Sequence, residues 1–138
     1  MTTNDIWYNY SDLDSHIWYI KFGKMANENQ FQSFLVQYEV RYINFNKKSI
    51  IFNALDIEYM SFGQCYQLAN MMKRMKHVHM EKLSCFVIVI NNAYIISLLN
   101  FIFSIVSPVR PYIICKTVDM AKKFIYVKNP NVYQLNQC

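Results

Sequence analysis

The stretch of sequence that decides the fold is Leu83–Val109, LSCFVIVINNAYIISLLNFIFSIVSPV, which contains no charged residue. A segment of this length can span a lipid bilayer. However, Asn91 and Asn92 stand near its middle, and Asn100 and three serines follow them. Polar side chains are costly in hydrocarbon. The sequence therefore favours a buried strand, CFVIVI, an Asn-Asn turn and a helix, AYIISLLNFIFSIV, over a transmembrane span, and we do not expect a membrane partner.

Short apolar runs alternate with amphipathic runs along the rest of the chain. The predicted strands are Asp5–Asp12, His16–Phe22, Ser49–Leu55, Cys85–Ile90 and Tyr112–Lys116. The predicted helices are Asn27–Tyr42, Ser61–His79, Ile95–Val106 and Thr117–Val127. The order β-β-α-β-α-β-α-β-α predicts an α/β fold with a mostly parallel, four- to five-stranded sheet, about four helices and right-handed crossovers. The first strand is expected at an antiparallel edge.

Helical spacing also predicts which side chains face the core. The first helix is expected to bury Phe31, Phe34, Leu35, Tyr38 and Tyr42, with Asn27 as its N-cap. The second is expected to bury Cys65, Leu68, Ala69, Met72 and Met75. The last is expected to bury Met120, Ala121, Phe124 and Ile125.

Length and composition indicate one ordered domain, which we place at residues 1–128, followed by a tail at residues 129–138. Hydrophobic residues make up 54% of the 138 residues, and only two glycines and three prolines are present. So few turn-forming residues argue against an all-β fold. The abundance of Asn, Ile, Lys, Tyr and Phe is typical of an AT-rich genome. The formal net charge of +5 fits attraction to acidic partners.

The cysteines favour a reducing compartment. Cys65, Cys85, Cys115 and Cys138 show no CxxC spacing, and Cys85 and Cys115 lie inside apolar runs, where a thiol behaves as a small buried hydrophobe. The N-terminal segment is acidic and aromatic, unlike a signal or transit peptide. We therefore expect a cytoplasmic or other reducing intracellular location.

Tyr59–Lys76, YMSFGQCYQLANMMKRMK, places one of the two glycines just after Ser61 and before a helix. A strand that feeds directly into a helix needs a tight turn, and a helix packed close to a sheet favours a residue without a side chain. Ser61 is also a good N-cap. Because a helix N-terminus is favourable for phosphate, Ser61 is a candidate for either a helix cap or a phosphoacceptor.

The element order and this turn resemble the STAS domains of anti-sigma-factor antagonists and of sulfate transporter tails. The family pattern is an apolar strand, a Phe-Ile-Asp-Ser-Ser-Gly-Leu-like turn and a helix; here the strand is SIIFNAL. The segment VRPYIICKTVDMAKKFI is similar to the family's closing strand, polar cap and final helix. The resemblance implies that Ser61 matches the phosphorylated serine and Gly63 the turn glycine. The family's preceding Asp is Met60 here, and its second Ser or Thr is Phe62.

Two other features near the second helix are candidates for binding chemistry, a basic patch and a pair of histidines. A basic patch is formed by Lys73, Arg74, Lys76, His77 and Lys82, and it is a candidate for nucleic acid or an acidic membrane surface. A solvated helix face is the alternative interpretation. His77 and His79 are expected as surface histidines near a helix C-terminus, because i and i+2 diverge on a helix and no further zinc ligands are evident.

We expect a non-catalytic, regulatory protein–protein interaction module. No Ser-His-Asp set, phosphate-binding glycine loop or paired carboxylates is evident, so neither enzyme activity, a cofactor, a metal nor a small-molecule substrate is predicted. The candidate interface is Tyr59, Met60, Phe62, Gln64 and Tyr66. The expected partner is a protein or a second copy of the chain, and a larger viral or organellar assembly is one setting in which such a module is expected. The alternatives are a phosphorylation switch at Ser61 and nucleic-acid or membrane-surface binding through the basic patch.

Overall fold

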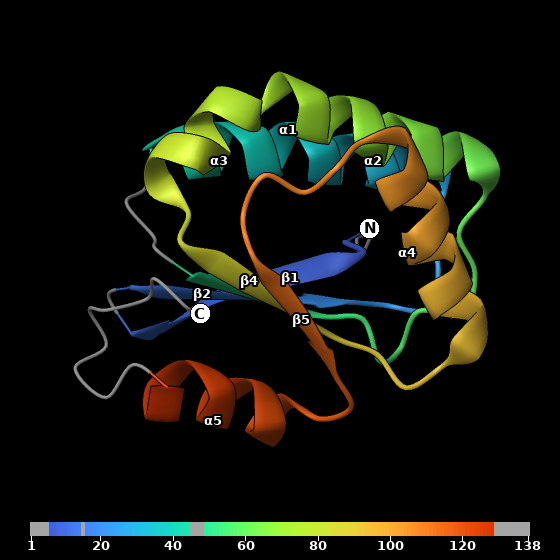
Figure 1. Ribbon diagram of the computed structural model, residues 1–138. Helices are drawn as coiled ribbons and strands as arrows, with labels where there is room; N and C mark the ends of the chain where they lie inside the picture. The colour runs from blue at the N-terminus through green and yellow to red at the C-terminus, as the bar shows by residue number, and fades with distance from the viewer. Residues whose placement is uncertain (1–5, 15, 45–48, 129–138) are drawn as a thin grey trace.

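The computed structural model describes residues 6–14, 16–44 and 49–128, and Figure 1 shows the arrangement of their helices and strands. Within these residues the strands are β1 Tyr8–Asp14, β2 Ile17–Phe22, β3 Ser49–Asn53, β4 Cys85–Val89 and β5 Tyr112–Cys115. The helices are α1 Glu28–Asn44, α2 Phe62–Arg74, α3 Lys76–Lys82, α4 Ala93–Ile105 and α5 Val118–Lys128. The predicted α/β class is confirmed. The predicted tail, residues 129–138, lies outside the described residues.

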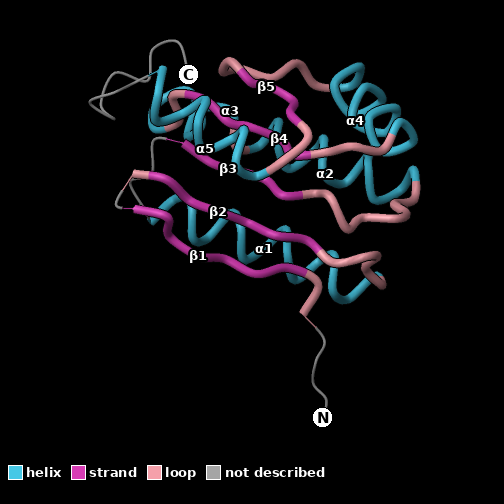
Figure 2. The backbone as a smooth tube through the Cα atoms, turned by 90° about the horizontal axis from the view of Figure 1, so that it is seen from below, coloured by secondary structure: helices cyan, strands magenta, loops and turns pink. Residues whose placement is uncertain are grey.

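The five strands form one mixed sheet in the order β1-β2-β3-β4-β5, so each strand lies beside the next one in the chain (Figure 2). β1 pairs with β2 in antiparallel orientation, whereas the pairs β2–β3, β3–β4 and β4–β5 are parallel. β1 and β5 are therefore the two edges of the sheet.

Four helices and one helix cover opposite faces of the sheet. In Figure 1, α1, α2 and α3 lie above the sheet, α4 stands at one end of it and packs into the upper core, and α5 lies below it. Alternate residues of a strand point to opposite faces, so β2 sends Trp18 and Ile20 towards the upper layer and Ile17 towards α5. β3 divides in the same way, with Ile50 above and Ile51 below. The molecule thus has a large upper core and a smaller lower core.

The upper core is rich in aromatic rings because α1 lays its apolar stripe on β1 and β2. The helix buries the five residues that the spacing predicts: Phe31, Phe34, Leu35, Tyr38 and Tyr42. Asn27 caps this helix through its side-chain oxygen, which accepts a hydrogen bond from the backbone N–H of Gln30 at 2.8 Å. Stacked rings of Trp18, Tyr38 and Tyr42 continue the core.

Among the described helices, α5 is the one that covers the lower core, and it packs against β3, β4 and β5. Ala121 and Ile125 are fully buried there against Ile17, Ile51 and Val87. The prediction for Met120 was wrong: its side chain is 50% exposed. Of the four residues predicted to face inward, α5 fully buries two, Ala121 and Ile125, so its buried face is narrower than predicted.

The predicted helix Ser61–His79 is divided at Met75 into α2 and α3. Met75 has φ −88° and ψ 3°, and its backbone N–H still bonds to Met71. The break leaves both Met75 and His79 buried. The structure therefore has five helices in the described residues, where about four were expected.

The uncharged stretch Leu83–Val109 is a strand, a turn and a helix. β4 is buried along its whole length, and Asn92 then caps α4 by accepting a hydrogen bond from the N–H of Tyr94 at 2.8 Å. α4 buries Ile95, Leu98 and Ile102. Among the described residues, every helix is too short or too polar to cross a membrane.

Candidate functional site

The turn between β3 and α2 is built around Ser61, the N-cap residue of α2. The Ser61 hydroxyl accepts a hydrogen bond from the backbone N–H of Gln64 at 3.0 Å, and the Gln64 side-chain oxygen accepts one from the Ser61 N–H at 3.0 Å. This reciprocal pair is a capping box, which satisfies two N–H groups that would otherwise lack partners. The Gln64 amide also donates to the carbonyl of Ala26 at 3.0 Å, so it joins the turn to the start of α1.

Gly63 does not have the packing role that the sequence suggested. It is the second residue of α2 and is exposed, and a Cβ atom built on it would meet only the Ser61 Oγ, at 3.7 Å. Space for a side chain is therefore available. The closer backbone approach is at Gly23, where a Cβ would lie 3.4 Å from the carbonyl oxygen of Trp7. The N–H of Gly23 donates to that oxygen at 2.7 Å.

Three of the five residues predicted as an interface are on the surface. Phe62 is 67% exposed, Tyr66 53% and Tyr59 49%. Met60 and Gln64 are corrections to the prediction, because both are buried. Met60 belongs to the upper core, and the capping box holds Gln64 against the loop before α1.

α4 adds a ring that the sequence analysis missed. The ring centre of Phe101 lies 5.1 Å from that of Phe62 and 6.0 Å from that of Tyr66, with edge-to-face geometry in both pairs. We call these three rings, together with the exposed Tyr59 that precedes them in the chain, the aromatic surface. The sequence did contain a signal for this ring. Ser97, Asn100 and Ser104 form a polar face on α4, and this face places the neighbouring Phe101 beside solvent.

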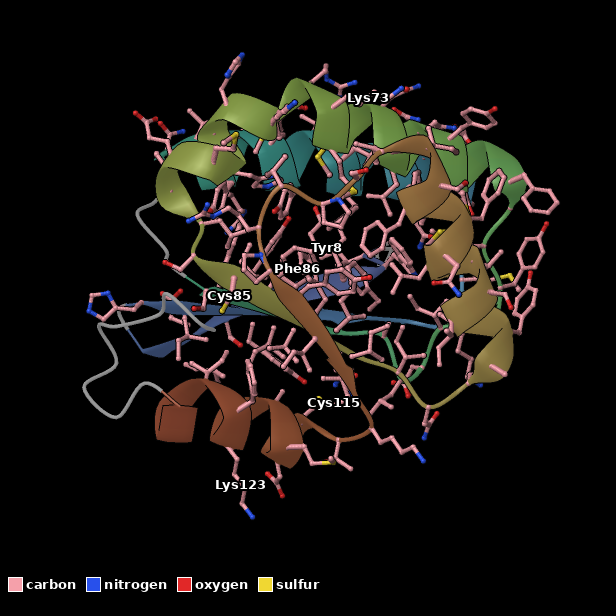
Figure 3. The ribbon with its side chains drawn as sticks, in the orientation of Figure 1. Tyr8, Lys73, Cys85, Phe86, Cys115 and Lys123 are labelled. Atoms are coloured by element: carbon pink, nitrogen blue, oxygen red, sulfur yellow. The ribbon has the colours of Figure 1, made fainter. Side chains whose placement is uncertain are left out.

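The predicted basic patch lies at the end of α2 and along α3. Lys73, whose side chain points away from the sheet in Figure 3, is exposed, as are Lys76 and His77. Arg74 instead forms an ion pair with Glu39 of α1, with 3.1 Å between its Nη2 and the Glu39 Oε1. The Lys82 Nζ donates to the carbonyl of Ile43 at 2.6 Å. Two of the five side chains therefore tie α1 to α2 and α3.

His79 is a buried core residue, which corrects the expectation of a surface histidine. Its Nε2 and the Tyr38 hydroxyl are 2.9 Å apart, and its ring also lies beside that of Tyr42. Burial lowers the pKa of His79 from 6.5 to about 4, because the charged imidazolium would lose its hydration. His79 is therefore neutral at physiological pH.

The thiols of Cys65 and Cys115 do not lie in surroundings that would activate them as nucleophiles. Cys65 is fully buried in the upper core, and Cys115 at the end of β5 is partly buried. Burial raises the pKa of both thiols, which disfavours the nucleophilic thiolate. Across residues 6–14, 16–44 and 49–128, no group of three His, Cys, Asp or Glu side chains is arranged to hold a metal ion.

Comparison with known proteins gives no family assignment. No protein-family model matches the chain, and no curated protein matches it. Function is therefore inferred from the residues and their geometry.

Proposed function

We propose that the chain is a non-catalytic, STAS-like interaction module that binds a partner protein through the aromatic surface. The observation that carries this proposal is the position of Phe62. This large ring stands in the first turn of α2, is 67% exposed, and packs on one side against Phe101. Its other side is open to a partner.

Exposed aromatic rings are effective anchors for protein contacts. They bury a large apolar area with little loss of side-chain entropy, and such residues are enriched among those that dominate binding energy. Here the capping box and Phe101 already hold the start of α2 in one conformation. A partner would therefore meet a surface that is largely pre-organised.

The STAS-like assignment is supported by the order of the elements and by the local geometry at Ser61. An apolar strand, β3, leads through a turn to a capped helix, α2, and the chain closes with a parallel strand and a final helix. The serine that the resemblance places at the regulatory position is the residue that caps α2.

A double variant tests the aromatic surface. Phe62→Ser with Tyr66→Ser should remove a native partner, or abolish self-association, while the free energy of unfolding changes little because both side chains are exposed. The matched control is Met120→Ser, which changes a side chain that is 50% exposed on α5, across the sheet. Affinity capture from the native source and sedimentation of the purified chain are the measurements. Equal binding by the double variant and the control would contradict the proposal.

Phosphorylation of Ser61 is a second candidate function, favoured by the position of this residue directly before Phe62. A phosphate there would add about two negative charges at the edge of the aromatic surface, and the N-terminus of α2 would favour that charge locally. Apolar contact with a partner would then be weakened by the cost of removing water from the phosphate. The basic patch has no comparable support, because Arg74 and Lys82 are engaged within the molecule.

Two substitutions separate the cap from the switch. Ser61→Ala should lower the free energy of unfolding by about 1 kcal/mol through loss of the cap, and should leave partner binding intact. Ser61→Asp should keep the cap, since Asp is also a good N-cap, but should weaken partner binding through its charge. Chemical denaturation and a binding titration measure the two effects. Partner binding that is the same for Ser61→Asp and wild type would rule out the switch and leave the contact surface standing.

A further inference from the structure

The upper core contains a cavity of about 150 Å³ between the sheet and the helices α1, α2 and α4. Its wall is almost wholly apolar and includes Trp7, Phe31, Met71, Phe86, Leu98 and Ile102. Figure 3 shows the side chain of Phe86 in the space between the sheet and the helical layer. A mainly apolar space of this size can accept a guest the size of benzene. The space therefore suits an apolar group of about six to eight carbon atoms.

The polar residues on the cavity wall are Tyr38, His79, Ser107 and Arg110. His79 is neutral and faces the Tyr38 hydroxyl, so it offers no charge to a guest. Arg110 lies in the connection between α4 and β5 and is only partly buried. The cavity thus combines an apolar body with one guanidinium on its wall.

Arg110 has hydrogen-bonding capacity left for a ligand. Its Nε donates to the carbonyl of Leu83 at 2.7 Å, which fixes the side chain and leaves four N–H donors of the guanidinium. Among the residues that the structure describes, no carboxylate forms an ion pair with it. A guanidinium held in this way matches a carboxylate, which it can bind through two parallel hydrogen bonds.

From this geometry we infer that the cavity binds a small amphiphilic monocarboxylate, with its six- to eight-carbon apolar part inside and its carboxylate on Arg110. The net charge of +5 favours the approach of such an anion. This site is independent of the proposed partner contact, because it lies beneath α2 and α4 and involves none of the exposed rings.

Titration with octanoate tests the inference, with octan-1-ol as the uncharged comparison. Trp7 lines the cavity and Trp18 does not, so octanoate should cause a saturable change in tryptophan fluorescence and raise the melting temperature. In Trp7→Phe the change in fluorescence should disappear while the rise in melting temperature remains. No saturable response to octanoate in the wild-type chain would overturn the inference.

Two kinds of variant test the two parts of the site. Arg110→Gln should weaken octanoate binding about tenfold and leave octanol binding within about twofold, since only the carboxylate uses the guanidinium. If this variant does not fold, Arg110→Lys keeps the charge without the bidentate geometry and should weaken octanoate binding in the same direction. Leu98→Phe, or Val106→Phe if the first is unstable, should fill the cavity and abolish binding of both ligands. Unchanged octanoate affinity in the Arg110 or cavity-filling variants would contradict the assignment.

Discussion

Gly63 occupies a helical position in α2 that has room for a side chain. A Cβ there would make only an ordinary contact of 3.7 Å with the Ser61 Oγ. Glycine loses more backbone freedom on folding than alanine, so Gly63→Ala should raise the free energy of unfolding by about 0.5–1 kcal/mol. Urea denaturation measures this change. A decrease instead would mean that the turn needs a backbone conformation that alanine cannot adopt.

His79 makes folding stability depend on pH. Its pKa is about 4 in the folded chain and 6.5 in the unfolded chain, so the unfolded state binds more protons between these values. Stability from this residue is therefore fully present above pH 6.5 and falls as the pH drops towards 4, by at most about 1.4 kcal/mol per pH unit.

Denaturation at pH 7 and pH 5 checks this effect, because most carboxylates remain ionised at both values. His79→Gln is the informative variant: it keeps a polar group near the Tyr38 hydroxyl and removes the titration. The loss of stability between pH 7 and pH 5 should be smaller in His79→Gln than in the wild-type chain. The same loss in both proteins would show that another group causes it.

At the scale of the elements, the lower core is expected to be stabilised mainly by the contacts that α5 makes with the sheet. Ile125 is fully buried against the sheet, so Ile125→Ala should lower the free energy of unfolding by about 2–5 kcal/mol. Met120→Ala on the same helix removes a side chain that is 50% exposed and should change it by less than about 0.5 kcal/mol. Thermal and chemical denaturation of the two variants give the comparison. Similar losses would mean that α5 does not pack as described.

Elements with strong periodicity and a cap could be predicted from the sequence. The first helix combines an N-cap at Asn27 with five apolar residues at helical spacing, and α1 buries all five. The division of the second helix at Met75 could not be predicted, because no Pro or Gly marks it. It depends on tertiary packing, which buries Met75 and His79 together in the upper core.

The candidate site was only partly predictable for a similar reason. Loop residues follow no period, so the sequence did not reveal that Met60 turns inward while Tyr59 and Phe62 remain exposed. Gln64 could have been assigned from the Ser61-x-x-Gln64 spacing, which is the signature of a capping box. The contact between Phe101 and Phe62 could not be predicted, because it depends on the packing of α4 beside α2.

At the scale of the whole molecule, the uncharged stretch Leu83–Val109 decides the architecture because it forms the strand β4 of the sheet and then the helix α4. β4 contributes to both cores, because Phe86 and Ile88 face the upper layer while Val87 and Val89 face α5. α4 then covers one end of the upper face and brings Phe101 to the start of α2. The aromatic surface therefore exists only in the folded sheet domain.

The most direct test of the proposed contact is site-specific photo-crosslinking in the native source. A photoreactive phenylalanine analogue is placed at position 62 in one chain and at position 120, on α5 across the sheet, in another. We predict a discrete crosslinked protein, or a crosslinked dimer, from position 62 that is absent from position 120 and lost when Tyr66→Ser is added. The same products from both positions, or none from position 62, would contradict the account.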